Sequence, residues 1–237
     1  MKSSFAPEDY FEYRGVQPAD HPISRVPAYL ARQLARTQRP RILDFGCGFG
    51  QLLVALRSAG FESIEGFDIE PRAIAHCRSL GLQCHDGRSD AGFHENHQAQ
   101  YDFIIMSHVL EHFPKHEIIQ QLSRIKLLLK PGGALVAMVP NAQSATGCYW
   151  AYEDFTHHVL FTSGSLRYVL RAAGFSQVEF LDPHCVEGLS APKRWLRLAL
   201  LELYRLNYRF WNRVTASAVH AGSPILLSFE IKALARA

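Results

Sequence analysis

The chain has 237 residues, enough for one α/β domain with about 40 to 60 residues of additions. Hydrophobic residues make up 48% and charged residues 20%, which excludes a disordered chain, and a net charge of +3 does not favour a nucleic-acid partner. The five cysteines lack C-x-x-C spacing and predict neither a disulfide framework nor a zinc site; since no apolar signal core or membrane span is visible, we expect a cytoplasmic protein.

Residues 1–38 precede the first predicted strand. They contain an aromatic run, Tyr10-Phe-Glu-Tyr13, and a predicted helix from about Ile23 to Ala35 that follows Pro22. Two interpretations stay open for this N-terminal segment. It forms a helical lid over the mouth of a site, or it packs as a helix outside the sheet.

From Arg41 onward, short apolar runs alternate with helical patterns, which predicts a parallel, doubly wound sheet. Helices are expected at about 51–57, 71–80, 115–129 and 163–173, and a polar loop is expected after the third strand. The expected strands are Arg41–Phe45, Ser63–Phe67, Leu82–His85, Tyr101–Ser107, Ala134–Val139, Val178–Leu181 and Ile225–Ala233.

An insertion at 184–222 separates the last two strands, and its centre, Lys193–Arg213, has helical periodicity. One side of this helix gathers arginines, and the other carries Leu196, Ala199, Leu203, Leu206 and Phe210. A helix docked on the core with a solvated basic face is one interpretation. The alternatives are a homodimer contact or a helix lying peripherally on an anionic membrane.

The first strand ends in a glycine turn of the form G-x-G-x-G, at Gly46, Gly48 and Gly50. The dinucleotide pattern G-x-G-x-x-G fails at Gln51. We place Asp44 inside this turn, where its carboxylate would repel a pyrophosphate and attract an ammonium or sulfonium group. The turn therefore predicts a nucleoside ligand that carries positive charge.

The carboxyl ends of the parallel strands should meet at the switch point between the first and fourth strands. There Asp68 is expected to accept hydrogen bonds from both ribose hydroxyls, and Asp86 to reach the adenine amino group. The segment 107–112 should lie under the remainder of the ligand. The predicted contacts are Asp44, Gly46, Cys47, Gly48, Gly50, Asp68, Ile69, Asp86, Ser107, His108 and His112.

Four segments, 42–50, 67–69, 101–112 and 128–133, together resemble class I S-adenosylmethionine-dependent methyltransferases. The resemblance covers residues 40–182 and agrees with a cationic nucleoside, S-adenosylmethionine. It implies a methyltransferase domain over 39–237, with a seven-stranded sheet in the order 3-2-1-4-5-7-6 and strand 7 antiparallel. A nicotinamide-dependent oxidoreductase is disfavoured by Asp44 and Gln51.

Two further resemblances concern the acceptor and a metal. Pro140-Asn141 and Tyr152–Thr162 are similar to a segment of bacterial methyltransferases of surface polysaccharide and lipopolysaccharide synthesis. Ubiquinone-pathway O-methyltransferases carry Glu-x-x-x-Glu-His as a magnesium site, and this chain has Ser107 at the first position. We therefore predict no metal.

The candidates for the base are His157 and His158 in the loop after the fifth strand, and we favour His157, oriented by Asp154. His108 and His112 are alternatives, and His157 could instead bond to backbone and pin its loop. We expect O-methylation of a sugar or related hydroxyl, on a small-molecule or glycan acceptor of envelope assembly. The alternatives are a quinone-like or other small acceptor, and a non-catalytic cofactor-binding protein of the same fold.

Overall fold

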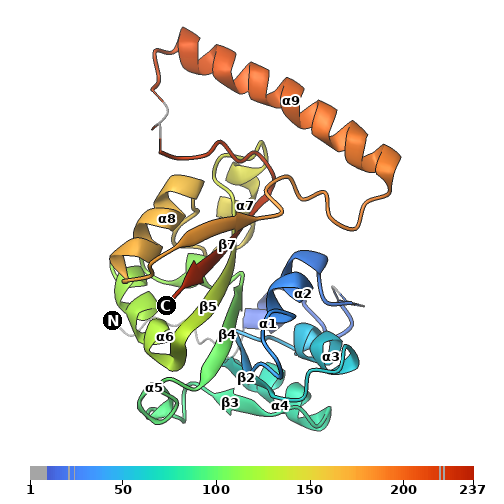
Figure 1. Ribbon diagram of the computed structural model, residues 1–237, viewed down its shortest axis with the longest axis vertical. Coiled ribbons are helices and arrows are strands. Elements are labelled where there is room, and N and C mark those ends of the chain that lie inside the picture. Colours follow the sequence, from blue (N-terminus) through green and yellow to red (C-terminus); the bar gives the residue numbers. More distant parts are fainter. Residues whose placement is uncertain (1–9, 21, 24, 219, 221) are drawn as a thin grey trace.

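Seven strands form one sheet in the order β3-β2-β1-β4-β5-β7-β6 (Figure 1). The computed structural model describes residues 10–20, 22–23, 25–218, 220 and 222–237. β7 runs antiparallel to β5 and β6, whereas the pairs between β1, β2, β3, β4 and β5 are parallel. The predicted order and the antiparallel last strand are confirmed. The strands are β1 (Ile42–Phe45), β2 (Ile64–Asp68), β3 (Cys84–Asp86), β4 (Tyr101–Ser107), β5 (Leu129–Pro140), β6 (Val178–Leu181) and β7 (Glu230–Arg236).

Helices cover both faces of the sheet, so its central strands are buried on both sides. Ile42 packs with α2 and α3 on one face, and the next residue, Leu43, packs with α6 and α8 on the other. The helices are α1 (Tyr10–Tyr13), α2 (Ala28–Leu34), α3 (Gln51–Ser58), α4 (Pro71–Ser79), α5 (Phe93–Asn96), a 3-10 turn η2 (Leu110–His112), α6 (Ile118–Leu128), α7 (Gly147–Glu153), α8 (Ser163–Ala172) and α9 (Ala191–Val214).

The helix that precedes β1, α2, is shorter than predicted. It was expected from about Ile23, but α2 begins at Ala28, with Pro27 in an extended conformation at its N-cap (ψ 139°). A proline disfavours helical backbone at the residue before it, so the helix cannot extend back through Val26. Residue 24 lies outside the described residues.

The last strand is shifted relative to the prediction, from Ile225–Ala233 to Glu230–Arg236. The physical reason is Asn141, at the end of β5. Its buried side-chain amide donates to the carbonyl oxygens of Leu226 (2.8 Å) and Ser228 (2.7 Å), which therefore serve a side chain instead of a neighbouring strand. β5 is also longer than predicted, because Leu129 pairs with Tyr101 across a register shift.

Two short helices were not predicted. α5 lies in the polar stretch after β3, where a loop was expected, and α7 lies in the connection after β5. The helix of the insertion, α9, is close to its predicted bounds, but none of its residues is buried, and it stands away from the domain body (Figure 1). Among the described residues, no helix has both the length and the hydropathy needed to cross a membrane.

Candidate functional site

The glycine turn between β1 and α3 has positive φ angles, which residues with a side chain rarely adopt. Gly46, Gly48 and Gly50 have φ angles of 80°, 51° and 78°. A Cβ on Gly46 would lie 2.3 Å from Cγ2 of Val109, so the turn can approach the segment after β4 only with glycine there. The turn is held to β2 because the backbone N–H of Gly46 donates to the Phe67 carbonyl at 2.7 Å.

Asp68 ends β2 and fixes this turn. One carboxylate oxygen accepts the Gly48 N–H at 2.7 Å, and the other accepts those of Ile69 (2.8 Å) and Glu70 (2.9 Å). Burial raises the pKa of Asp68, and these backbone donors oppose that rise. A carboxylate has about four acceptor positions. Three of these positions are used by the backbone N–H donors. A ligand hydroxyl can therefore bond to the fourth position or replace the Gly48 N–H.

Asp44 lies inside β1 and not in the turn, which corrects the placement expected from the sequence. Its carboxyl group is buried next to Asp68 and Cys84. Burial and the charge of Asp68 raise the pKa of Asp44 to about 7. A cationic ligand group placed beside these two carboxylates would stabilise their ionised forms, so the charge pattern at the turn fits S-adenosylmethionine.

The other predicted cofactor contacts lie along the same edge of the sheet. Asp86 ends β3 in register with Asp68, and it accepts the Arg88 N–H at 3.0 Å. Ile69 is 46% exposed just after β2, where it offers an apolar surface. Cys47 is buried beneath the turn, and Ser107 is the last residue of β4.

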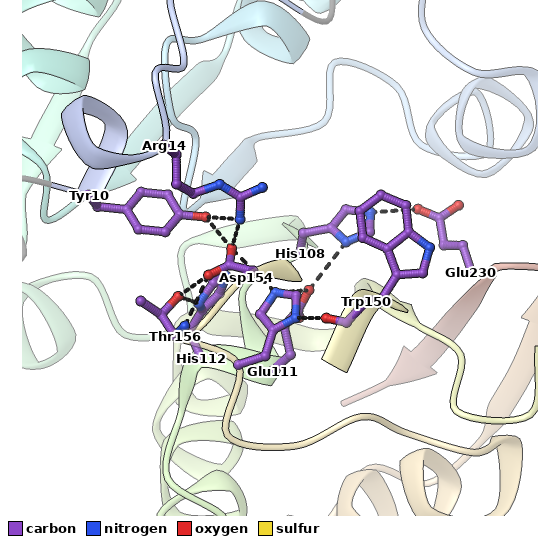
Figure 2. A network of polar contacts seen from close by, with 10 residues as sticks. Tyr10, Arg14, His108, Glu111, His112, Trp150, Asp154, Thr156 and Glu230 are labelled. Atoms are coloured by element: carbon purple, nitrogen blue, oxygen red, sulfur yellow. Dashed lines mark hydrogen bonds and ion pairs between the residues drawn. The ribbon is translucent and has the colours of Figure 1, made fainter. Parts of the chain in front are cut away.

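The segment after β4 carries a charged chain of contacts (Figure 2). His108, whose φ of 55° is unusual for a non-glycine residue, lies between two carboxylates. Its Nδ1 is 3.2 Å from Glu111, and its Nε2 is 3.0 Å from Glu230 of β7. Burial lowers the pKa of His108, but the two carboxylates outweigh it and raise the pKa well above its usual range. The two carboxylates thus favour the cationic ring, which makes His108 a weaker candidate for the base than His112 or His157.

His112 is oriented through a hydroxyl. Its Nδ1 lies 2.7 Å from Thr156 Oγ1, and that hydroxyl donates to Asp154 Oδ1 at 2.6 Å. Because the hydroxyl proton is used on Asp154, Nδ1 of His112 carries its own hydrogen and Nε2 has the lone pair. Burial lowers the pKa of His112, which favours the neutral ring.

The ring of His157 lies close to two carboxylates, those of Asp154 and Glu111. Its Nδ1 is 2.7 Å from the Trp150 carbonyl oxygen, which fixes the ring. Its Nε2 is 3.6 Å from Asp154 and 3.9 Å from Glu111. The backbone bond is the geometry of the alternative in which His157 pins its loop. The role of Asp154 in orienting a catalytic His157 stays a prediction. His158 is exposed, and its backbone N–H bonds to the Glu111 carbonyl.

The N-terminal helix α1 reaches this network, which the sequence did not reveal. Tyr10 donates a hydrogen bond to Asp154 Oδ2 at 2.7 Å, and Arg14 forms an ion pair with the same atom (Figure 2). The Tyr10 ring also meets His112 edge-on, with the ring centroids 5.7 Å apart. Burial raises the pKa of Asp154, but the hydrogen bonds from Thr156 and Tyr10 outweigh it and lower that pKa to about 2.

Three groups of described residues could each offer ligands to a metal ion, with their ligand atoms within 4.8 Å of one another. In the group formed by Glu111, His112 and His157, Oε2 of Glu111 is buried without a partner among the described residues. The absence of a metal stays a prediction. A second group consists of three cysteines that are distant in sequence, Cys47, Cys77 and Cys84. The third consists of Glu65, His85 and His97.

Comparison with known proteins gives the family. Residues 17–179 match the family described as a methyltransferase domain, and the chain belongs to it. A ubiquinone biosynthesis O-methyltransferase of Azoarcus sp. (strain BH72) is 28% identical over 182 residues, which are 74% of this chain and 70% of that protein. The protein is an S-adenosylmethionine-dependent methyltransferase, and its cofactor is S-adenosylmethionine.

Solved structures share the fold. A SAM-dependent methyltransferase from Archaeoglobus fulgidus superposes with a TM-score of 0.62 at 22% identity, covering 89% of this chain and 92% of its own. A Haloferax volcanii putative methyltransferase, solved in a complex with the Trm112 activator, superposes with a TM-score of 0.65 at 18% identity, covering 98% and 97%.

Proposed function

We propose that this methyltransferase acts on a hydroxyl oxygen of a small acceptor. The observation that carries the proposal is a cluster of side chains able to accept a proton, in the segments after β4 and α7: His112, His157, Asp154 and Glu111. A hydroxyl must lose its proton as it attacks, so its methylation gains from a base. The name of the Azoarcus relative, an O-methyltransferase, agrees with oxygen as the acceptor atom.

The cofactor supplies an electrophilic methyl group on a positively charged sulfur. Asp44 would stabilise its cationic part, Asp68 its ribose, and the N–H groups of the turn would approach it closely. Ile69 and Asp86 would contact its adenine ring. Because one bond forms as another breaks, the chain contributes mainly by alignment, worth roughly 7–11 kcal/mol at best.

The reaction balances with a single proton acceptor. The acceptor oxygen bonds to the methyl carbon, the carbon–sulfur bond breaks, and its electron pair stays on sulfur, which becomes neutral. We assign the hydroxyl proton to Nε2 of His157. Asp154 and Glu111, at 3.6 and 3.9 Å, would stabilise the resulting imidazolium. Trp150, through its carbonyl, holds the ring in place.

The acceptor that we favour is a sugar or a related ring-bearing hydroxyl compound. Tyr149, Tyr152 and Phe155 project from α7 and the residues after it, and all three are exposed. Such side chains offer flat apolar surfaces against which a ring can stack. A quinone-like phenol would use the same surfaces, and it is the second candidate because the Azoarcus relative acts in ubiquinone biosynthesis.

The test is methyl transfer from labelled S-adenosylmethionine to a panel of nucleotide sugars, free sugars and catechols. We expect label in an ether that resists mild acid and base. The Asp68→Ala variant, which should lose the cofactor, serves as the background. Label only on an amine, or only on protein, would refute hydroxyl methylation. Label on catechols alone would refute the sugar and support the phenolic alternative.

A further inference from the structure

The insertion helix α9 exposes an apolar face over its whole length. From Leu196 to Val214 large apolar side chains recur at intervals of three and four, which places them on one side of a helix, and the two tryptophans border that side. Their exposed fractions reach 72% at Trp195 and 63% at Leu203. The set comprises Trp195, Leu196, Leu200, Leu203, Leu206, Phe210, Trp211 and Val214. We call it the outer face of α9.

The opposite side of α9 is the side that contacts the domain. The Tyr204 hydroxyl donates to the Gln143 carbonyl at 3.4 Å, and the Gln143 side chain donates to the Tyr208 hydroxyl at 3.5 Å. Arg197, which precedes Tyr204 by about two helical turns, donates a hydrogen bond to the Cys185 carbonyl. These contacts orient the helix, so its apolar stripe faces away from the body. The interpretation in which this stripe docks on the core is therefore wrong.

The charges of α9 identify what can cover the outer face. Glu202 is the only acidic residue between 191 and 214, and it pairs with Arg205 at 2.8 Å. The basic residues are Lys193, Arg194, Arg197, Arg205, Arg209 and Arg213. A second copy of this helix would bring two such sets of cations together. A surface of anionic lipid would instead oppose them with negative charge.

We propose that α9 lies in the surface of an anionic lipid bilayer, with its outer face in the boundary between headgroups and acyl chains. Tryptophans at the two ends, Trp195 and Trp211, suit this boundary because the indole ring is apolar and its N–H is polar. Arg209 and Arg213 contact the lipid phosphates, whereas Arg197 bonds to the Cys185 carbonyl and Arg205 pairs with Glu202. This proposal depends on α9 alone and not on the identity of the methyl acceptor.

The experiment is co-sedimentation of the full chain with lipid vesicles. We expect binding to phosphatidylcholine vesicles that contain phosphatidylglycerol, weaker binding at high salt, and little binding to phosphatidylcholine alone. A blue shift of tryptophan emission on binding would report burial of the indole rings. Absence of binding to the anionic vesicles would overturn the proposal.

Matched variants distinguish vesicle binding through the outer face from nonspecific hydrophobic binding. Leu203→Glu combined with Leu206→Glu should weaken vesicle binding by about tenfold or more. Leu127→Glu is the control, because Leu127 lies on α6 and is exposed to a similar extent, 59% against 63% for Leu203. Arg209→Glu with Arg213→Glu should remove the dependence on phosphatidylglycerol. Equal binding by the double leucine variant and the wild type would overturn the proposal.

Two further measurements keep the outcomes distinct. Cofactor affinity without vesicles should be unchanged in every α9 variant, which separates this proposal from the cofactor site. Sedimentation velocity of the vesicle-free protein should show no change of mass between the wild type and Leu203→Glu. A dimer that dissociates in that variant, together with no vesicle binding, would identify a second copy as the occupant and overturn the membrane proposal.

Discussion

The Tyr10 hydroxyl donates a 2.7 Å hydrogen bond to Asp154, a residue 144 positions away in the chain. This bond closes the N-terminal helix α1 over the polar network that contains His112 and His157. Phe11 extends the contact to the glycine turn, where its ring lies 4.6 Å from that of Phe49. We propose on this basis that α1 acts as the lid expected from the sequence.

The first prediction concerns this lid. Tyr10→Phe should increase hydrogen exchange at the backbone amides of 10–16 by roughly tenfold, because a hydrogen bond to a charged group contributes about 1.5–3 kcal/mol. Tyr168→Phe, at an exposed position on α8, is the matched control. Exchange measured by mass spectrometry checks the prediction. Equal protection in the Tyr10 variant and the wild type would show that the bond does not hold α1 in place.

The second prediction concerns Asp68. Asp68→Ala should weaken S-adenosylmethionine binding by at least about tenfold, because it removes the ribose acceptor and also releases the Gly48 N–H that shapes the turn. Isothermal titration calorimetry measures the change. Glu179→Ala, an exposed carboxylate on β6, should bind the cofactor normally. Unchanged affinity in the Asp68 variant would rule out this position as the ribose site.

The third prediction is a pH dependence set by Asp44. Since burial and Asp68 raise the pKa of Asp44 to about 7, the group is mostly protonated in the cofactor-free protein below that pH. A cation binds the ionised form, so cofactor affinity should fall by roughly tenfold for each pH unit below about 7 and stay level above it. Asp44→Asn should bind more weakly, and its affinity should not follow this profile.

Stability gives an independent check with the opposite sign. The pKa of Asp44 is higher in the folded protein than its unfolded value of 3.8, so ionising it disfavours the folded state as the pH rises through about 7. Asp44→Asn should therefore unfold at a higher temperature than the wild type at about pH 8, while the difference shrinks in acid. Identical melting curves at both pH values would contradict the raised pKa.

The fold was predictable because its signals are local. Apolar runs, the prolines and the glycine turn lie within a few residues of the elements that they define, and β4 and β6 match their predicted bounds. The shift of β7 could not be predicted, since it depends on the Asn141 amide, which reaches residues 85 and 87 positions away. The side of α9 that faces the domain could not be predicted for the same reason, since it depends on contacts with Gln143, which is distant in sequence. Periodicity defines an apolar face but not what that face contacts.

The site was predicted only in part, for a related reason. The residues of the glycine turn and the strand ends follow from topology, because parallel strands end at the same edge. The polar network joins α1, the segments after β4 and α7, and β7. No sequence spacing records that Tyr10 contacts Asp154 or that His108 contacts Glu230. The aromatic run that contains Tyr10 was the one available signal. The cysteine cluster was hidden in the same way, since Cys47 and Cys84 are 37 positions apart.

The last prediction separates the two histidines that could accept the proton. His157→Gln should lower kcat by about 10²–10⁴-fold and leave cofactor affinity unchanged, because its Nε2 is held near Asp154 and Glu111 to receive a proton. His158→Gln changes the adjacent, exposed ring and should keep the wild-type kcat. If His112→Gln abolishes turnover while His157→Gln retains the wild-type kcat, then His112 is the base. In that case His157 has the structural role of fixing the loop after α7 through the Trp150 carbonyl.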